Sequence, residues 1–171
     1  MGSVKLKEID SGEVVFIDSN IFIYEFSSHE EFGPPCLEFL RRVEETDVLG
    51  VTSVNVLDEV LYKSMLIEIS NIEDISISEA SVELRDSPEK INKLERSISN
   101  VKELFGLPIL VLDTKKRNFR EGLTNVRKYR LRPHDATILQ TIKSHGIESI
   151  ATKDSDFERV EWLDVYRPGR E

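Results

Sequence analysis

The amino-acid sequence predicts an α/β domain with a mainly parallel sheet. Short apolar runs rich in β-branched residues alternate with longer amphipathic segments, and this alternation of strands and helices is typical of the class. The first run, residues 14–17, is apolar throughout, as expected for a strand buried on both faces of a parallel sheet. With 171 residues, the chain fits one domain that buries roughly two-thirds of the surface its unfolded form exposes.

The first part of the chain contains two predicted strands with a helix between them. The first strand, residues 14–17, ends abruptly at Asp18. An amphipathic helix is expected over 34–46, because Pro35 suits a first helical turn and apolar residues follow at helical spacing. Residues 48–51 are the second predicted strand.

The central part of the chain is harder to interpret. Thr52 or Ser53 can cap a helix, since apolar residues recur after them at helical spacing. Residues 68–87 show no clear period, and an insertion, a lid or an oligomerisation arm would each fit them. A helical pattern returns after Pro88 and ends at Gly106.

Strands and helices alternate again toward the C-terminus. Residues 108–112 are a buried strand, and the basic segment after them is expected to form one or two helices around Gly122. A helix over 135–146 and a strand over 147–152 follow, and residues 165–166 are a last short strand.

No internal repeat, linker or low-complexity tract divides the chain. We expect an N-terminal extension over 1–12 and one domain over 13–171, in which 68–90 is an insertion or a lid. No apolar run approaches the roughly 20 residues needed to cross a bilayer, and the N-terminus lacks an apolar core of signal-peptide length. Cys36 is the single cysteine, which excludes an internal disulfide and a cysteine-based zinc cluster. A cytoplasmic location is therefore expected.

The net charge of −9 is unevenly distributed along the chain. Residues 115–132 contain one acid and eight basic residues and carry +7, which leaves −16 on the remaining residues. This asymmetry fits a basic surface for nucleic acid on an otherwise acidic body, and fits equally a solvated helix face without a partner. The candidate RNA-binding residues are Lys115, Lys116, Arg117, Arg120, Arg127, Lys128, Arg130 and Arg132.

Two acids directly follow predicted strands: Asp18 after the first and Asp154 after the strand at 147–152. Parallel strands joined by right-handed crossovers end at one edge of the sheet, where open sheets of this kind bind ligands. Carboxylates that lie together repel one another, and a divalent cation offsets that repulsion. Mg²⁺ and Mn²⁺ prefer oxygen ligands, and a pair of them about 3.5–4 Å apart can activate water for phosphodiester hydrolysis. The pattern therefore suggests a metal site at this edge.

Each acid, considered singly, also has a structural interpretation. Asp18 and Asp135 are both suited to cap a following helix, and for Asp135 alone capping is the stronger interpretation. Asp154 and Asp156 could serve only to form a turn. A metal site therefore requires that these acids converge from separate segments of the chain.

The sequence contains none of the motifs that would indicate the other common catalytic sites. A GxxxxGK[ST] phosphate loop, a GxGxxG turn and a GxSxG elbow are all absent. His29, His134 and His145 lack zinc-binding spacing. His134 precedes Asp135 and could touch a substrate, but a loop histidine is the favoured interpretation.

Four segments, in order, resemble the PIN-domain family, and in particular its VapC-like toxin branch. They are VVFIDSNIFIY at 14–24, VNVLDEVLYK at 54–63, LRPHDATILQT at 131–141 and IATKDSDFERV at 150–160. Asp58 and Glu59 both sit at the border of an apolar helical stripe, so periodicity does not choose between them, but the family's acid falls on Glu59. The resemblance spans about residues 13–167. It assigns the four family acids to Asp18, Glu59, Asp135 and Asp154.

This resemblance implies a three-layer α/β/α sandwich with the acids gathered at the carboxyl ends of the strands. It implies an endoribonuclease that depends on Mg²⁺ or Mn²⁺, in which the four acids bind the ion and Asp156 assists. Asn20 and Thr152 would orient the acids through hydrogen bonds. RNA would be the substrate, with Phe119 or Tyr129 stacking on a base. The expected protein partners are an antitoxin and a second copy of the chain.

Three alternatives remain open. The chain is longer than the usual toxin, mostly between Glu59 and Asp135, so a PIN nuclease that processes RNA and is not a toxin fits as well. A non-catalytic PIN-like module that binds RNA or protein is disfavoured, because all four acids are present. A phosphatase or phosphoacceptor domain on a similar sheet is also disfavoured, because Asp18 is the single acid directly after the first strand.

Overall fold

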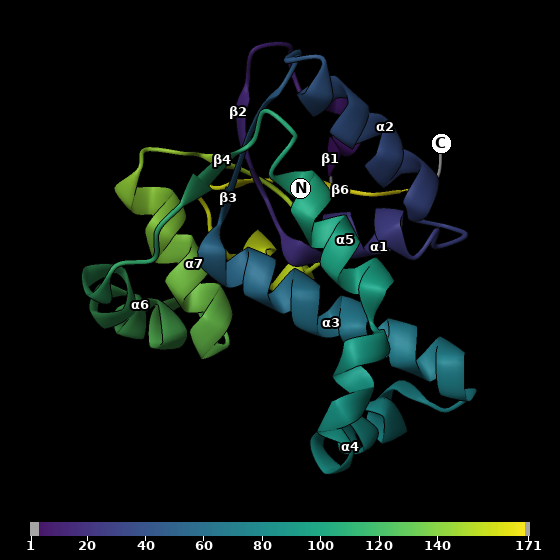
Figure 1. Ribbon diagram of the computed structural model, residues 1–171. Helices are drawn as coiled ribbons and strands as arrows, with labels where there is room; N and C mark the ends of the chain where they lie inside the picture. Colours follow the sequence, from purple (N-terminus) through teal and green to yellow (C-terminus); the bar gives the residue numbers. More distant parts are fainter. Residues whose placement is uncertain (1–3, 170–171) are drawn as a thin grey trace.

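The computed structural model describes residues 4–169, so the ends of the expected extension and domain, residues 1–3 and 170–171, lie outside it. Within this range, six parallel strands form one sheet in the order β1-β6-β5-β2-β3-β4, which confirms the predicted parallel α/β class (Figure 1). The strands are β1 Val4–Lys5, β2 Val14–Ile17, β3 Leu49–Ser53, β4 Leu110–Leu112, β5 Ser149–Ala151 and β6 Asp164–Arg167.

The helices flank this sheet and complete a three-layer α/β/α sandwich. The α-helices are α1 Ser19–Phe26, α2 Gly33–Glu44, α3 Val54–Glu73, α4 Ile77–Asp86, α5 Glu95–Leu104, α6 Lys116–Tyr129 and α7 Pro133–Ser144. Short 3₁₀ helices are η1 Leu6–Glu8, η2 Pro88–Lys93 and η3 Ser155–Arg159. In Figure 1, α6 and α7 lie together on the left of the molecule, and α1 and α2 lie on the right.

Strand β2 lies in the middle of the sheet because its side chains can be buried on both faces. Val15, Phe16 and Ile17 have no exposed surface, and β2 pairs with β3 on one side and with β5 on the other. Burial of large apolar side chains of this kind contributes about 1.5–3 kcal/mol each to folding. The uninterrupted apolar run therefore positions the residue that follows it, Asp18, at the centre of one sheet edge.

The path of the chain reverses between β2 and β5. From β2 the chain proceeds to β3 and β4 on one side, then returns past β2 and continues through β5 to β6 on the other side. Right-handed crossovers in opposite directions place their helices on opposite faces and leave a crevice at the reversal point. The carboxyl ends of β2 and β5, which precede Asp18 and Thr152, lie at that crevice.

Strand β1 was not predicted from the sequence. Val4 and Lys5, within the expected N-terminal extension, pair with Tyr166 and Arg167 of β6 and extend the edge of the sheet. A two-residue strand is too short to produce a periodic pattern. Its position depends on β6, which is distant in the sequence.

Residues 68–87, which showed no clear period, are helical in the structure. Helix α3 continues to Glu73, ends with Asp74 in the left-handed conformation, and is followed by α4. Figure 1 shows α4 and the end of α3 projecting from the body as an arm. The arm has a small core of its own, made by Leu66, Ile69, Ala80, Leu84 and Leu94. Because this core draws on two helices and a loop, its residues do not follow one helical period.

The helix expected directly after Pro88 begins later than predicted. A 3₁₀ segment occupies 88–93, and α5 starts at Glu95. The carboxylate of Glu68 accepts hydrogen bonds from the backbone N–H groups of Arg96 and Ser97, so a side chain of α3 satisfies the first turn of α5. This capping partner lies about 28 residues away in sequence and is therefore invisible to local pattern.

Helices α6 and α7 pack closely, with Gly122 at their contact. The basic segment forms a single helix that passes through Gly122, where a Cβ atom would lie 3.0 Å from the carbonyl oxygen of Ala136 in α7. The structure also corrects the capping role considered for Asp135. Arg132 is the N-cap of α7 and Asp135 is its third residue, so the Asp135 side chain is free to face the crevice.

Replacing Gly122 with alanine should lower the free energy of unfolding by about 1–3 kcal/mol, because the added methyl group meets backbone that cannot move aside cheaply. Urea unfolding measures this value. The matched control is Leu123→Ala on the exposed side of the same helix, expected to change stability by less than about 0.5 kcal/mol. Equal stability of the Gly122→Ala protein and the original chain would contradict this close contact.

Candidate functional site

Asp18 lies at the junction of β2 and α1 and performs two roles there. As the N-cap of α1, its Oδ1 accepts a hydrogen bond from the backbone N–H of Ser19 at 2.7 Å. Its Oδ2 accepts from the Thr152 hydroxyl at 2.6 Å and from the Asn20 amide at 2.5 Å. The carboxyl group is therefore oriented by three donors although its side chain is almost fully buried.

The Thr152 hydroxyl group links the ends of β2 and β5, and it makes all the hydrogen bonds that a hydroxyl can make. The hydroxyl donates to Asp18 and accepts from the Asn20 amide and from the backbone N–H of Asp154, each at 3.0 Å. Asn20 also accepts from the backbone N–H of Lys153 at 2.8 Å. A hydroxyl has one proton and two lone pairs, so no further partner can be accommodated. This network holds Asp18 and Asp154 in a defined relative position.

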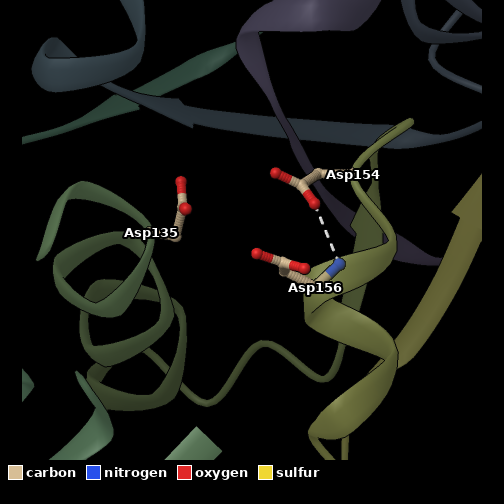
Figure 2. A group of neighbouring side chains, drawn as sticks. All are labelled: Asp135, Asp154 and Asp156. Carbon is tan, nitrogen blue, oxygen red and sulfur yellow. Dashed lines mark hydrogen bonds between the residues drawn. The ribbon is translucent and has the colours of Figure 1, made fainter. Parts of the chain in front are cut away.

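Three acids meet beyond these strands. Asp135 on α7 and the pair Asp154 and Asp156 after β5 each offer a carboxylate oxygen, and the three oxygens lie within 4.8 Å of one another. Figure 2 shows the side chain of Asp135 opposite those of Asp154 and Asp156, with the hydrogen bond from the Asp156 backbone N–H to Asp154 Oδ1 at 2.8 Å. The side chains converge from segments about 20 residues apart, and the group contains two of the four predicted acids, Asp135 and Asp154, but neither Asp18 nor Glu59.

Glu59 faces the same region from the first turns of α3, whereas Asp58 is exposed. Its carboxylate pairs with Lys63 at 2.6 Å, and Nε2 of His134 lies 3.2 Å from its other oxygen. The neighbouring Glu59 carboxylate raises the pKa of His134, which favours the protonated imidazole at this contact. The structure thus corrects the interpretation of His134 as a loop residue: it is in the first turn of α7 and touches a site acid.

The electrostatics of the site reflect burial and crowding of acids. Burial raises the pKa of Asp18 to about 6, against the hydrogen bonds from Thr152 and Ser19, and the charges of Glu59 and Asp135 add to the rise. Burial also raises the pKa of Asp135. Glu59 is the opposite case: burial raises its pKa, but His134 and Lys63 outweigh burial and lower it to about 2. Glu59 is thus a permanent anion, and Asp18 titrates near neutrality.

Cations of the same chain accompany the acid cluster. Arg132 donates from Nε to Asp135 at 3.1 Å and from a terminal nitrogen to Asp154 at 2.8 Å. Arg159 pairs with Asp156 at 2.7 Å. The spacings of these pairs are visible in the sequence, since Arg132 is three residues before Asp135 and Arg159 three residues after Asp156.

The basic segment divides into two parts relative to the acids. Asn118 near the start of α6 donates to Ser144 at the end of α7, so Lys115, Lys116 and Arg117 lie at the end of the helix pair that is remote from Asp135. All eight basic residues are exposed. Arg132 touches the cluster, and the carbonyl of Arg130 accepts a hydrogen bond from Arg159.

The two candidate stacking residues differ in their surroundings. Phe119 is more than half exposed on α6, whereas the ring of Tyr129 is half-buried beneath the Lys128 ammonium group, 4.7 Å from its centroid. Phe119 lies beside Asn118, at the end of the helix pair remote from Asp135. Its ring is thus available to a partner, but at a distance from the acids.

The donor set fits a hard divalent cation. The converging atoms are carboxylate oxygens, the ligand type preferred by Mg²⁺ and Mn²⁺. A buried carboxyl group such as Asp18, whose ionisation is opposed by its surroundings, is stabilised as an anion when a cation binds beside it. Hydrogen bonds from Asn20 and Thr152 resemble those that commonly orient metal ligands.

Comparison with known protein families identifies the fold. A model of the PIN domain matches residues 15–163. The chain belongs to the PIN domain family. The four acids that the motifs predict lie inside the matched range, as do Asn20, Thr152 and Asp156.

Individual relatives agree with this assignment. The chain is 28% identical over 151 residues to the protein named Ribonuclease VapC2 of Methanocaldococcus jannaschii, which covers 88% of this chain and 91% of that protein. A Mycobacterium tuberculosis structure, VapC20, described as a toxin that cleaves the sarcin-ricin loop, matches with a TM-score of 0.60 at 12% identity over 89% of this chain and 98% of that one. A toxin-antitoxin complex from Klebsiella pneumoniae matches with a TM-score of 0.55 at 17% identity over 92% and 99%. At such identities, the structural matches establish the fold of this PIN domain.

Replacing Thr152 with valine should weaken Mn²⁺ binding about 10- to 100-fold, because the hydroxyl that orients Asp18 and Asp154 is lost. Isothermal titration calorimetry measures the affinity. Thr152→Ser retains the hydroxyl and should bind nearly as the original chain does. Thr141→Val is the matched control, since that buried hydroxyl bonds only a carbonyl within α7. A Thr152→Val protein with unaltered affinity would show that the network does not support the ligands.

The raised pKa of Asp18 predicts a pH dependence of Mn²⁺ affinity. At about pH 5 the Asp18 carboxyl group, with a pKa of about 6, is mostly protonated, and a metal ion must displace that proton to bind. At about pH 7 the group is mostly ionised, so the affinity for Mn²⁺ should rise about tenfold over this interval. Glu59→Gln should keep most of the slope but move it to lower pH, because burial is the main cause of the raised pKa of Asp18 and the charge of Glu59 a smaller one. An affinity that is constant between these pH values would contradict the assignment of Asp18 as a ligand.

Proposed function

We propose that this PIN domain is a metal-dependent endoribonuclease of the VapC-like kind that hydrolyses phosphodiester bonds in RNA. The observation that carries the proposal is the convergence of Asp135, Asp154 and Asp156 within 4.8 Å at the reversal point of the sheet. The similarity to Ribonuclease VapC2 over 91% of that protein supports the choice of RNA as substrate. A PIN nuclease that processes RNA without being a toxin would use the same site.

The proposed ligands of the ion are the four carboxylates of the family, with Asp156 as an additional ligand or a close neighbour. Bound Mg²⁺ or Mn²⁺ would polarise a phosphoryl oxygen and lower the pKa of a water molecule, which is the chemistry that phosphodiester hydrolysis requires. The proposed catalytic residues are Asp18, Glu59, Asp135 and Asp154.

The remaining residues of the site hold these carboxylates in place. Asn20 and Thr152 orient Asp18 and Asp154 through the hydrogen bonds described above. Lys63 and His134 keep Glu59 ionised and turned toward α7. These groups make the geometry available before substrate arrives, which reduces the reorganisation that catalysis would otherwise need.

The basic residues of 115–132 are proposed to bind the RNA backbone. Phosphate contacts supply most sequence-independent affinity, and Arg130 and Arg132 are positioned next to the acids. Lys115, Lys116 and Arg117 would contact RNA farther along the strand, beside the exposed ring of Phe119. The acidic remainder of the chain would keep RNA away from other surfaces.

The protein partners and location are proposals of the same kind. An antitoxin is supported by the similarity of the fold to the toxin-antitoxin complex from Klebsiella pneumoniae. A homodimer and a cytoplasmic location accompany the VapC-like assignment. Across residues 4–169, no helix combines the length and the apolar character that crossing a membrane requires.

Exchange of Glu59 for glutamine should reduce RNA cleavage at least about 100-fold, since a neutral amide removes a metal-ligating charge. The matched control, Asp58→Asn, changes the neighbouring exposed acid by the same chemistry and should cleave normally. Cleavage of a single-stranded RNA with Mn²⁺, and with EDTA, provides the measurement. Cleavage that survives EDTA would reject metal dependence. Mn²⁺ binding without RNA cleavage would favour a non-catalytic PIN module.

A further inference from the structure

Arg132 has an unusual position for a residue of a basic RNA-binding segment. Its guanidinium group reaches Oδ2 of Asp135 at 3.1 Å and Oδ2 of Asp154 at 2.8 Å, so one side chain bridges two of the acids that converge in the site. Arg159, in contrast, contacts one acid, Asp156, and one backbone carbonyl. Among the residues the structure describes, Arg132 is therefore the cation most closely placed between site carboxylates.

Arg132 binds two of the carboxylates that a divalent ion would also bind. Asp154 Oδ1 already accepts the backbone N–H of Asp156, so Oδ2 is the less committed oxygen of that side chain. The guanidinium takes this atom together with an oxygen of Asp135. A guanidinium carries one positive charge and binds carboxylates through a planar fork, whereas Mg²⁺ or Mn²⁺ brings two charges to the same oxygens. The guanidinium and the metal ion therefore compete for the negative charge of the same two carboxylates.

Release of Arg132 should cost little. Its side chain is 71% exposed, and ion pairs of such exposed groups are weak because water and salt compensate for their loss. The backbone of Arg132 caps α7, but its side chain makes no capping hydrogen bond. Movement or replacement of the side chain thus leaves the helix start intact.

We propose that Arg132 is an internal competitor of the metal ion: it neutralises Asp135 and Asp154 in the metal-free chain and yields them when the ion binds. The inference rests on the proposed function, because it takes these acids as metal ligands. Once released, the guanidinium remains beside the site on an exposed side chain, where it can pair with a phosphate group of the substrate. The same residue would then act at both stages, as a counter-ion before metal binding and as a phosphate contact after it.

The competition predicts the effect of removing the charge. Arg132→Gln should bind Mn²⁺ about two- to fivefold more tightly than the original chain, because no cation has to leave Asp135 and Asp154. Arg132→Lys should lie between the two, since an ammonium group keeps the charge but lacks the fork that spans both acids. Titration calorimetry with Mn²⁺ on the 171-residue chain without RNA measures these affinities.

The matched control is Arg41→Gln in α2. Arg41 is also an exposed arginine paired with an acid three residues away, Glu38, but it makes no contact with the site acids. This variant changes net charge equally and should bind Mn²⁺ as the original chain does. Thermal unfolding in EDTA gives a second readout: Arg132→Gln should be less stable than Arg41→Gln, and Mn²⁺ should raise its midpoint by a larger amount.

The outcomes separate the inference from the proposed function. Unchanged or weaker Mn²⁺ binding by Arg132→Gln, in a chain that binds Mn²⁺ and cleaves RNA, would overturn the competition and leave the nuclease assignment standing. Failure of the original chain to bind Mn²⁺ would reject both. Tighter Mn²⁺ binding by Arg132→Gln, with Arg41→Gln unchanged, supports the competition.

Discussion

Mutual repulsion among carboxylates is the constraint on which this site depends. Asp18 is held by three hydrogen-bond donors in surroundings that raise its pKa to about 6, and Asp135, Asp154 and Asp156 meet within 4.8 Å nearby. The chain reduces this repulsion with its own cations: Arg132, Arg159 and Lys63 each pair with an acid of the site, and His134 lies against Glu59. Folding stability and metal binding therefore draw on the same carboxylates.

The topology of the sheet brings these carboxylates close together. Reversal of the chain path between β2 and β5 opens a crevice at their carboxyl ends. Thr152 then ties the two ends together with one hydroxyl. The close approach of Gly122 to Ala136 packs α6 onto α7, the helix that carries Asp135. The site thus depends on a strand pairing, a side-chain network and a helix contact, none of which is local in sequence.

Prediction from sequence succeeded where local pattern and tertiary environment agree. The apolar run Val14–Ile17 and the strands ending near Ser53, Leu112 and Ala151 were predicted from their apolar side chains. The burial expected for the strand at 108–112 was wrong, because β4 lies at the edge of the sheet and Leu110 is mostly exposed. Prediction failed in the arm of α3 and α4, whose small core combines residues of two helices and a loop. Prediction from sequence also missed β1, which forms because its backbone can pair with β6. Helix α5 begins later than predicted, because its first turn is capped by Glu68, which is distant in the sequence.

The sequence by itself determined the parallel α/β class, the acids that follow strands, and, through four ordered motifs, the family whose model matches residues 15–163. These properties depend on residue type and spacing alone. The regular geometry of strands and helices determines which of the residues share a face and which follow the end of a strand. Only the tertiary structure placed His134 against Glu59 and brought Arg132 onto Asp135 and Asp154. The physical reason is that side-chain direction and charge pairing depend on neighbours from other segments, and those neighbours are defined only when the chain has packed.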